Sequence, residues 1–428
     1  MTNRIVLGLL GSCAAVSFAA PALAQDGDDS YFRRDRNVSV QERPRPEYQV
    51  PPIQAGAFLY QPRLAIDADS TDNVFATEND EESDVILSIV PSLNMSTAWL
   101  RHALSGRASV NHREYLDFGD ESVTDFDIGA NGRLDFASNT EVDGGLNYAL
   151  LHEPRTSAGA ATRSLEPIEY QALGAYVGAE REFGRTRFGG TFDIRSFDFD
   201  DGELLGGVEI DQDNRDREDY SLELRGDYAL SSDTAIFTRA RYLAREYDSV
   251  FDDASGDDFT RNSSGYTFDV GADFDLSNLV RGQVGVGYLT RSFDDNDLAE
   301  VDGLSVDGLL EWFATPLMTA TFRAGRALQP SAIIGSGVYT GTAASAELDY
   351  ELLDNVVLNG GLSYAEDDYE GIDRADERIG ANFGGTYLLS RNVGVSANYY
   401  YSDQDSTGLA GQQDYSVNRF VVSLTLQR

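Results

Sequence analysis

Three histidines are the side chains best suited to act as general bases near neutral pH. They are His102, His112 and His152, and each alternates in step with the apolar side chains of its segment. Glu114 stands two residues after His112 and would share its face of a strand, but no serine or other nucleophile stands at a matching spacing. We therefore assign no catalytic residue and expect a protein that is not an enzyme, with lipid hydrolysis kept as a competing hypothesis.

Aspartates gather in two short stretches that could supply oxygen ligands to calcium. They are residues 198–201, which read Asp-Phe-Asp-Asp, and residues 211–213, which read Asp-Gln-Asp. Neither stretch has the glycine and the closing glutamate of an EF-hand loop. Because runs of like charge are usually solvated surface, we assign no metal ligand and expect no cofactor.

Most other charged side chains alternate with apolar ones, and the two signs occupy different segments. The basic residues on the polar faces are Arg107, Arg113, Arg187, Arg195, Arg239, Arg241, Arg245, Arg281, Arg291 and Arg323. The acidic residues on the polar faces are Asp127, Glu223, Asp227, Asp269, Asp273, Asp307, Glu311, Glu347 and Asp349. Arginine-bearing segments follow short turns and acidic segments precede them. Neighbouring strands would therefore place side chains of opposite charge next to each other.

Two interpretations of this charge pattern are open. Folding a turn at Ser232 would place Glu223 near Arg241, and such a cross-strand pair contributes about 0.2–1 kcal/mol. The charges would then form a wall of balanced ion pairs. Alternatively, they would create a transverse field that orients a polar solute in a channel. The alternation of sign from strand to strand favours the balanced wall.

These side chains need long strands to hold them, and residues 220–247 are the clearest example. Two runs, residues 220–230 and 234–247, flank a tight turn at Ser231-Ser232-Asp233. In both runs apolar and polar residues alternate with a period of two, which indicates strands with one apolar and one polar face. The runs are close to the roughly 9–11 residues that a tilted strand needs to cross a bilayer.

About eighteen such runs follow one another between Gly56 and Leu426. Short connections such as Asp354-Asn355 alternate with longer acidic ones such as residues 198–216 and 248–263. An even strand number leaves both termini in the periplasm, with the short turns beside them. The expected fold class is all-β: a transmembrane antiparallel up-and-down β-barrel of about 18 strands, with short periplasmic turns and longer acidic extracellular loops. The polar faces would line its lumen.

Aromatic side chains stand at a fixed offset before the short turns and share the parity of the apolar faces. They are Phe136, Tyr228, Phe274, Trp312, Tyr350 and Tyr387. A general preference of aromatics for strands does not explain a fixed offset. A ring of outward-facing aromatics at one height is typical of a membrane interface. We expect a periplasmic aromatic girdle at these positions.

The N-terminus resembles a secretory precursor. Arg4 precedes an apolar run, and Ala22-Leu23-Ala24 forms an A-x-A cleavage site, so we predict a signal peptide at residues 1–24. Cys13 is the single cysteine and would leave with the signal, which excludes disulfides in the mature chain.

The segment after the signal differs in composition from the rest. Residues 25–55 are polar and contain Pro44, Pro46, Pro51 and Pro52. Proline disfavours regular strands and helices, so we expect a flexible periplasmic extension. A plug or a partner-docking arm is the alternative. The outer-membrane barrel would occupy residues 56–428.

The overall charge limits the class of partner. The formal net charge is −39, and loss of Arg4 with the signal changes it by one unit to −40; the chain has no lysine. Such acidity repels phosphate and argues against nucleic acid. No later segment is apolar enough for a transmembrane helix. These properties favour the outer membrane of a Gram-negative cell, with a secreted β-sandwich array or solenoid as the alternative.

Several short motifs resemble a known family. They are Gln61-Pro62-Arg63-Leu64 through Thr71-Asp72-Asn73-Val74-Phe75, then Val90-Pro91-Ser92-Leu93 and Trp99-Leu100-Arg101-His102. With the hairpins that follow, the chain from about Gly56 resembles the putative β-barrel porin 2 family of proteobacterial outer-membrane proteins. The resemblance implies a porin-like barrel and an association with exopolysaccharide or capsule systems.

The expected function is a polar conduit for small solutes or an exopolysaccharide. The alternative is a structural barrel that scaffolds the envelope or polysaccharide assembly without an open pore. Expected partners are outer-membrane lipid and lipopolysaccharide, the barrel-assembly machinery and polysaccharide-export components, and no nucleic acid.

Overall fold

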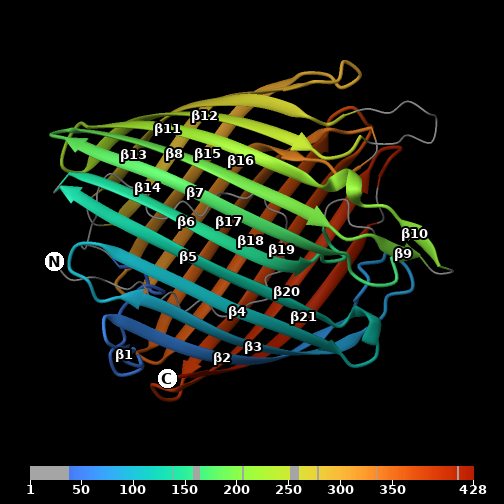
Figure 1. Ribbon diagram of the computed structural model, residues 1–428. Helices are drawn as coiled ribbons and strands as arrows, with labels where there is room; N and C mark the ends of the chain where they lie inside the picture. The colour runs from blue at the N-terminus through green and yellow to red at the C-terminus, as the bar shows by residue number, and fades with distance from the viewer. Residues whose placement is uncertain are drawn as a thin grey trace.

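The computed structural model describes residues 38–137, 139–157, 164–204, 207–250, 260–276, 279–333, 335–411 and 414–428. These residues form mainly β-strands (Figure 1), with two short 3-10 helices, η1 (Gly119–Glu121) and η2 (Asp213–Arg215), and no α-helix. No helix in this part of the chain is long and apolar enough to cross a bilayer. The signal peptide predicted at 1–24 and residues 25–37 of the predicted extension lie outside the described residues.

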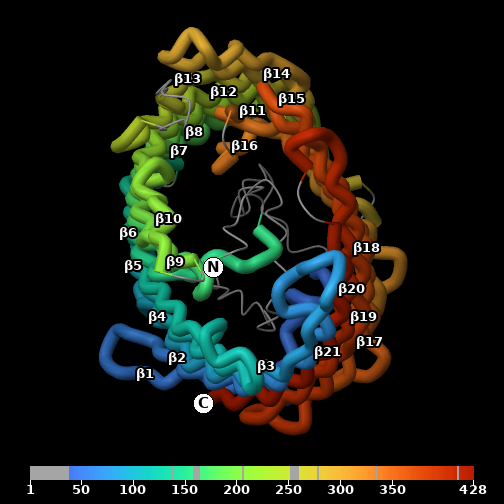
Figure 2. Tube along the Cα trace, turned by 90° about the vertical axis from the view of Figure 1, so that its right-hand side faces the viewer, coloured from blue at the N-terminus to red at the C-terminus, as the bar shows by residue number. Residues whose placement is uncertain are grey.

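Eighteen antiparallel strands form the wall of a closed barrel (Figures 1 and 2). Consecutive wall strands are neighbours, and the last strand pairs with the first, with Ala68 opposite Val422. The wall strands are β2 (Phe58–Thr71), β3 (Asp84–Thr97), β4 (Ala103–Tyr115), β5 (Val123–Ala137), β6 (Thr140–His152), β7 (Glu169–Phe183), β8 (Thr186–Phe199), β11 (Arg217–Ala229), β12 (Thr234–Tyr247), β13 (Ser263–Leu276), β14 (Val280–Phe293), β15 (Val301–Thr315), β16 (Met318–Pro330), β17 (Val338–Leu353), β18 (Val356–Tyr369), β19 (Ala375–Leu388), β20 (Val393–Thr407) and β21 (Tyr415–Gln427).

The predicted fold class and strand number are therefore confirmed. The wall strands are 13 to 16 residues long, which exceeds the roughly 9–11 residues needed to cross a bilayer. Strands β12 and β14 have the predicted bounds, whereas β20 continues five residues beyond its predicted end at Ser402, to Thr407.

Three short strands lie outside the wall. Strand β1 (Ile53–Ala55) pairs with the start of β2, with Ile53 opposite Tyr60. Strands β9 (Gly202–Leu204) and β10 (Val208–Ile210) form a small hairpin of their own. This hairpin lies within the connection between β8 and β11, in the stretch predicted as an irregular acidic loop.

The connections divide the barrel into two different ends. Turns such as residues 184–185, 316–317 and 354–355 lie at one end, here called the short-turn end. Gly184 has a φ of +64°, a left-handed conformation that glycine adopts without strain. The longer connections, such as residues 153–168 and 200–216, lie at the opposite, long-loop end. The chain leaves β21 at the short-turn end, where C is marked in Figure 1.

The burial of side chains in the wall is the reverse of that in a soluble protein: apolar side chains are exposed and charged side chains are buried. Apolar side chains such as Leu224, Val270 and Val286 are about half exposed on the outer face. Charged side chains such as Arg239 and Asp269 are at most 5% exposed on the opposite face. An apolar exterior and a polar interior are typical of a barrel surrounded by lipid.

Contacts between non-neighbouring strands identify the polar face as the concave, inner one. Arg225 on β11 donates a hydrogen bond to Gln283 on β14 at 3.0 Å, and both lie on the polar face. The ring of Phe237 is buried beneath Arg225, whose guanidinium carbon lies 4.4 Å from the ring centroid. Gly271 leaves room for this ring, because a Cβ there would lie 2.3 Å from both Phe237 Cζ and Val284 O.

We predict that Gly271→Ala destabilises the barrel by about 1–3 kcal/mol, because the added methyl group overpacks a site bounded partly by backbone. Urea unfolding of the protein in detergent micelles would measure the loss. The matched control is Gly303→Ala, since a Cβ at Gly303 would have no neighbour closer than 3.9 Å. Equal stability of the two variants would contradict the close packing of Phe237.

Candidate functional site

The inner face carries the ion pairs expected from the alternation of charge. Glu223 stands directly opposite Arg241, and Arg241 Nε donates to Glu223 Oε2 at 3.0 Å, so their predicted proximity is confirmed. Other predicted arginines pair with acids on a neighbouring strand: Arg107 with Asp127 (2.9 Å), Arg113 with Asp125 (2.8 Å), Arg187 with Asp227 (3.2 Å), Arg239 with Asp269 (3.2 Å), Arg281 with Glu311 (2.5 Å) and Arg323 with Glu347 (3.0 Å).

Three further residues of the predicted inner set also have charged partners. Arg245 pairs at 2.5 Å with Asp219, directly opposite on the neighbouring strand β11, whereas Arg195 lies 3.6 Å from Asp193 of its own strand. Asp307 lies 3.8 Å from Arg239, which joins β12 to β15 across the concave face.

Asp273, Arg291 and Asp349 complete the predicted set. Asp273 is buried on β13. Arg291 is 5% exposed, and the structure gives it no ion pair or hydrogen bond within the described residues. Asp349 accepts a hydrogen bond from Gln41 Nε2 at 2.6 Å, so its partner comes from the N-terminal segment.

The six aromatics of the predicted girdle all lie close to the short-turn end. Phe136, Tyr228, Trp312, Tyr350 and Tyr387 are exposed on the outer face, whereas Phe274 is half-buried. Their strand positions agree with a ring at one height, for example Tyr350 opposite Met318 and Tyr387 opposite Val356. Their role at a membrane interface stays a prediction.

Part of the N-terminal segment lies on the inner face at the short-turn end. Residues 38–48 contact β14, β16 and β17, and Val40, which is fully buried, donates its N–H to Thr319 Oγ1 at 3.1 Å. Glu351 on β17 accepts from Arg43 at 2.7 Å and from Arg45 at 3.3 Å.

Of the ion pairs that the described part of this segment makes with the wall, that between Arg45 and Glu351 is the most buried. Arg45 and Glu351 are 6% and 5% exposed. Burial lowers the pKa of Arg45, and the negative charge of Glu351 opposes that shift. Removing one partner of such a buried pair usually costs about 3–5 kcal/mol. These residues fall in the segment predicted as a flexible extension, and their contacts are of the kind that a plug would make.

At the long-loop end, connections fold inward and meet (Figure 2). Arg261, between β12 and β13, donates to the carbonyl of Ser331, between β16 and β17, at 2.7 Å. Arg261 also donates to Asn214 Oδ1 at 3.2 Å. These contacts join loops that start from well-separated strands of the wall.

Buried ion pairs fix other parts of the same end. Arg378 pairs with Asp367 and Arg374 with Asp376, each at 2.5 Å, and all four side chains are buried. These charges point inward because of strand parity. Asp367 on β18 and Arg378 on β19 lie on the same polar face of the wall as the predicted inner residues.

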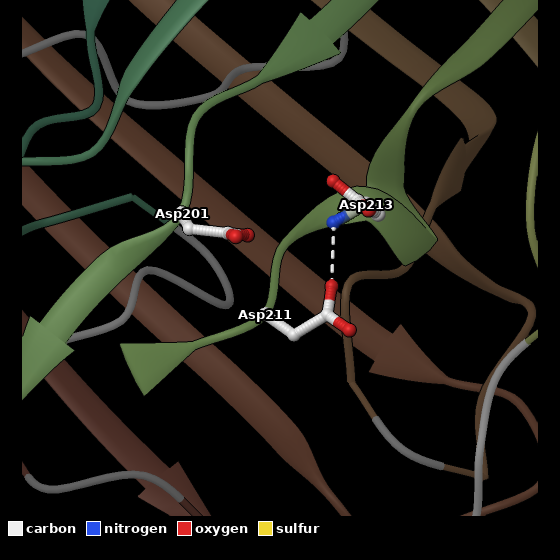
Figure 3. A group of neighbouring side chains, drawn as sticks. All are labelled: Asp201, Asp211 and Asp213. Atoms are coloured by element: carbon white, nitrogen blue, oxygen red, sulfur yellow. Dashed lines mark hydrogen bonds between the residues drawn. The ribbon is translucent and has the colours of Figure 1, made fainter. Parts of the chain in front are cut away.

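Three aspartates converge in the connection between β8 and β11 (Figure 3). The ligand atoms of Asp201, Asp211 and Asp213 all lie within 4.8 Å of one another. Asp213 N–H donates to Asp211 Oδ1 at 2.9 Å, and Gln212 N–H donates to Asp201 Oδ1 at 2.8 Å. The charges of Asp201 and Asp211 raise the pKa of Asp213. The two stretches considered separately as calcium ligands thus meet, and this exposed group is where a hard cation would find oxygen ligands.

Asp216 has the most strongly shifted carboxyl group in this connection. Burial raises its pKa from 3.8 to about 6, and the charges of Asp198, Asp213 and Asp248 act in the same direction. The Phe199 N–H, which donates to Asp216 Oδ1 at 2.7 Å, opposes the shift.

Two histidines have polar neighbours at the long-loop end. His112 is half-exposed and lies 2.9 Å from Thr124 Oγ1 and 3.5 Å from Glu114. His152 lies 2.9 Å from Asp125 and 3.4 Å from Glu169, and its side chain is only 13% exposed. His152 therefore faces acids at the rim, whereas its parity predicted a lipid-facing position.

Sequence reasoning placed Arg225 on the polar face of residues 220–230 but missed other residues that organise the inner face. Glu351 shares the parity of the predicted inner residues, so alternation could have identified it. Arg45, Arg215 and Arg261 lie outside the wall strands, and no periodic signal marks their positions.

Comparisons with known proteins agree with the barrel. Residues 45–428 match the model of the family described as putative beta-barrel porin 2. No curated protein sequence is significantly similar to the chain.

Solved structures resemble the chain in fold. The outer membrane protein opdK from Pseudomonas aeruginosa has 11% identity and a TM-score of 0.44, covering 86% of this chain and 99% of that one. Acinetobacter baumannii OccAB4 has 11% identity and a TM-score of 0.47, covering 90% and 100%. A ferric enterobactin receptor from Pseudomonas aeruginosa has 10% identity and a TM-score of 0.48, covering 88% and 82%.

The raised pKa of Asp216 predicts a pH dependence of the β8–β11 connection. Because ionisation is disfavoured in the folded loop, the stabilising contribution is fully present below about pH 3.8 and is lost as the pH rises through about 6. Amide protection in residues 199–216, corrected for intrinsic exchange rates, should therefore fall between pH 5 and pH 7.

Hydrogen exchange followed by mass spectrometry would measure this change. Asp216→Asn keeps an oxygen acceptor for the Phe199 N–H and should remove the dependence, whereas Asp120→Asn in another loop should preserve it. A protection profile that is flat in the unaltered protein would refute the assignment.

Proposed function

Because the chain belongs to the putative beta-barrel porin 2 family, we propose that it forms a polar conduit in the outer membrane of a Gram-negative cell. The cargo would be small polar solutes or a polysaccharide strand. The observation that carries this proposal is the inner wall of paired charges inside a closed barrel with an apolar exterior. Barrels of 16–18 strands are wide enough to leave an aqueous channel.

The distribution of charge supports weak selectivity along the wall. Acids and arginines alternate by strand and neutralise each other in pairs such as Arg241 with Glu223 and Arg323 with Glu347. A wall of this kind attracts water and polar solutes without excluding either sign of ion. The overall charge of −39 then predicts a mild preference for cations through long-range attraction.

Residues 38–48 are proposed to narrow the opening of the lumen at the short-turn end. This segment lies against the inner wall, and Glu351 holds it through both Arg43 and Arg45. Glu42 adds a contact at 3.5 Å to Arg281. Since these bonds are few, a partner or a voltage could release the segment and widen this opening.

A structural barrel without an open pore is the second candidate. The inward contacts at both ends, residues 38–48 at one and Arg261 with Ser331 at the other, favour it by occupying part of the lumen. Such a barrel would scaffold envelope or polysaccharide assembly, with lipopolysaccharide and export components as its partners.

Reconstitution into planar bilayers separates these two functions. The conduit predicts discrete steady current steps in salt, a reversal potential slightly on the cation-selective side in a salt gradient, and a polymer exclusion size that reports the pore. A reconstituted barrel that gives no current, even after removal of residues 25–55, would favour the scaffold and end the conduit proposal.

We predict that Glu351→Gln increases the single-channel current or the fraction of time spent in the open state. The substitution removes the charge that holds Arg43 and Arg45, and losing one partner of the buried pair with Arg45 costs about 3–5 kcal/mol of docking. A glutamate-specific protease should also cleave faster after Glu42 and Glu47 in this variant.

The matched control is Glu347→Gln, which lies on the same strand and face but pairs with the half-exposed Arg323. This control should conduct as the unaltered protein does. Identical currents and identical cleavage in all three proteins would show that the segment does not narrow this opening.

A further inference from the structure

A cavity of about 390 Å³ lies where the inward-folding connections meet at the long-loop end. Arg215, Arg217 and Arg261 contribute its cationic groups, and we call this cavity the arginine pocket. Its apolar and aromatic walls are Pro154, Tyr170, Phe197, Phe199, Tyr247, Pro330, Ala332 and Tyr339. Pockets for small ligands have volumes of roughly 300–1,000 Å³ and combine apolar walls with a few polar groups.

The three arginines are held in place by aromatic rings. The guanidinium carbon of Arg215 lies 4.1 Å from the Phe199 ring centroid, and that of Arg217 lies 4.2 Å from the Phe197 centroid. Arg261 lies 4.5 Å from the Tyr247 centroid. Contact of a guanidinium face with a ring leaves the N–H groups at its edge free to donate. Those of Arg215 donate to Glu153 and those of Arg261 to Ser331 and Asn214, so Arg217 is the arginine best placed to meet an added oxyanion.

Among the described residues, Glu153, which lines the pocket, and Asp219 engage only part of this positive charge. Glu153 accepts from Arg215 at 2.6 and 3.0 Å. Asp219 pairs with Arg245 at 2.5 Å, and the same carboxylate is 3.8 Å from Arg217. Arg217 Nε is buried and has no hydrogen-bond partner within the described residues.

Arg291 is a further cation close enough to Tyr247 to interact with it electrostatically, although it does not line the pocket itself. It is 95% buried, being 5% exposed, and its Nε and Nη1 have no hydrogen-bond partner in the described part of the chain. The charged or ionisable groups that act on it are Arg245, Asp219 and Tyr247, and Tyr247 also lines the pocket. A buried cation without a partner is costly, and an anion bound beside it would remove that cost.

From this charge balance we propose that the arginine pocket binds a small organic carboxylate with a ring-shaped or apolar body. The carboxylate would accept hydrogen bonds on the side of Arg217 and Tyr247, where the field of Arg291 adds to the attraction. The body of the ligand would pack against the rings and prolines of the wall. Because the chain as a whole is strongly acidic, an anion would be held here by local contacts and not by the long-range field.

This inference deepens the proposed function, because it names a class of solute for the conduit. It rests on the proposed conduit only for the path by which the ligand reaches the pocket. Binding measured by calorimetry does not require an open pore. A protein that conducts but does not bind a carboxylate would overturn the pocket alone. A protein that binds but does not conduct would overturn the conduit alone.

The test is calorimetric titration of the full chain, purified in detergent micelles, with benzoate. Benzamide, which lacks the charge, and inorganic phosphate, which lacks the apolar body, serve as comparison ligands. Benzoate should bind with one site per chain and should raise the thermal unfolding midpoint of the protein. Benzamide and phosphate should each bind at least about tenfold more weakly than benzoate.

Arg291→Met should weaken benzoate binding at least about tenfold, because it removes a cation whose Nε and Nη1 find no hydrogen-bond partner among the described residues. The variant should fold, since it replaces this buried charge with an apolar side chain of similar length. Arg217→Gln is the second variant if Arg291→Met does not fold. Arg181→Gln, which removes an exposed arginine that stacks on Phe183 at the short-turn end, should bind benzoate normally.

Three results would overturn the inference. The first is benzoate failing to bind to the unaltered protein. The second is benzamide or phosphate binding as tightly as benzoate, because the charge or the apolar wall would then contribute nothing. The third is Arg291→Met and Arg181→Gln binding benzoate with equal affinity.

Discussion

Hydrogen bonds between the first wall strand and the last, from Arg63 opposite Gln427 to Thr71 opposite Arg419, close the sheet on itself. Each wall strand then has a partner on both sides, so the backbone groups of the wall bond to one another. In hydrocarbon an unsatisfied backbone group costs several kcal/mol, and closure is the way in which a sheet avoids that cost. It also decides everything else about the wall, because it makes one face convex and the other concave.

The concave face concentrates charge, and the structure manages this charge differently along the barrel. In the middle, arginines pair with acids on the next strand, as in Arg239 with Asp269 and Arg241 with Glu223. At the short-turn end, Glu351 takes its partners from the N-terminal segment. At the long-loop end, among the residues that the structure describes, arginines outnumber the carboxylates that pair with them around Tyr247, and aromatic rings provide part of their contacts. The charges of the wall are thus balanced in its middle. The N-terminal segment at one end and the clustered arginines at the other depart from that balance.

Alternation of polar and apolar residues is enough to describe the wall almost completely. The hairpin at Ser231-Ser232-Asp233 has the expected register, with Glu223 opposite Arg241, and β12 ends at the predicted Tyr247. The errors lie where strands leave the wall. Strand β20 continues to Thr407, since Asp403 and Asp405 still pair with β19 although their polarity suggested a loop. The β9–β10 hairpin lies in a stretch whose glycines and acids carry no clear period.

The sequence by itself determined the strands, their number, the face to which each side chain points and the neighbours that it meets across a turn. All of these follow from a period of two residues and from turns between adjacent strands, so the interactions involved are local. The tertiary structure alone decided that Arg45 meets Glu351 and that Arg215, Arg217 and Arg261 surround one cavity. Arg215 and Arg217 are neighbours in sequence, but Arg261 comes from another connection and Arg45 from the N-terminal segment, and only closure of the ring brings these two to their partners. Their proximity depends on distances across the lumen, and no spacing along the chain encodes such distances.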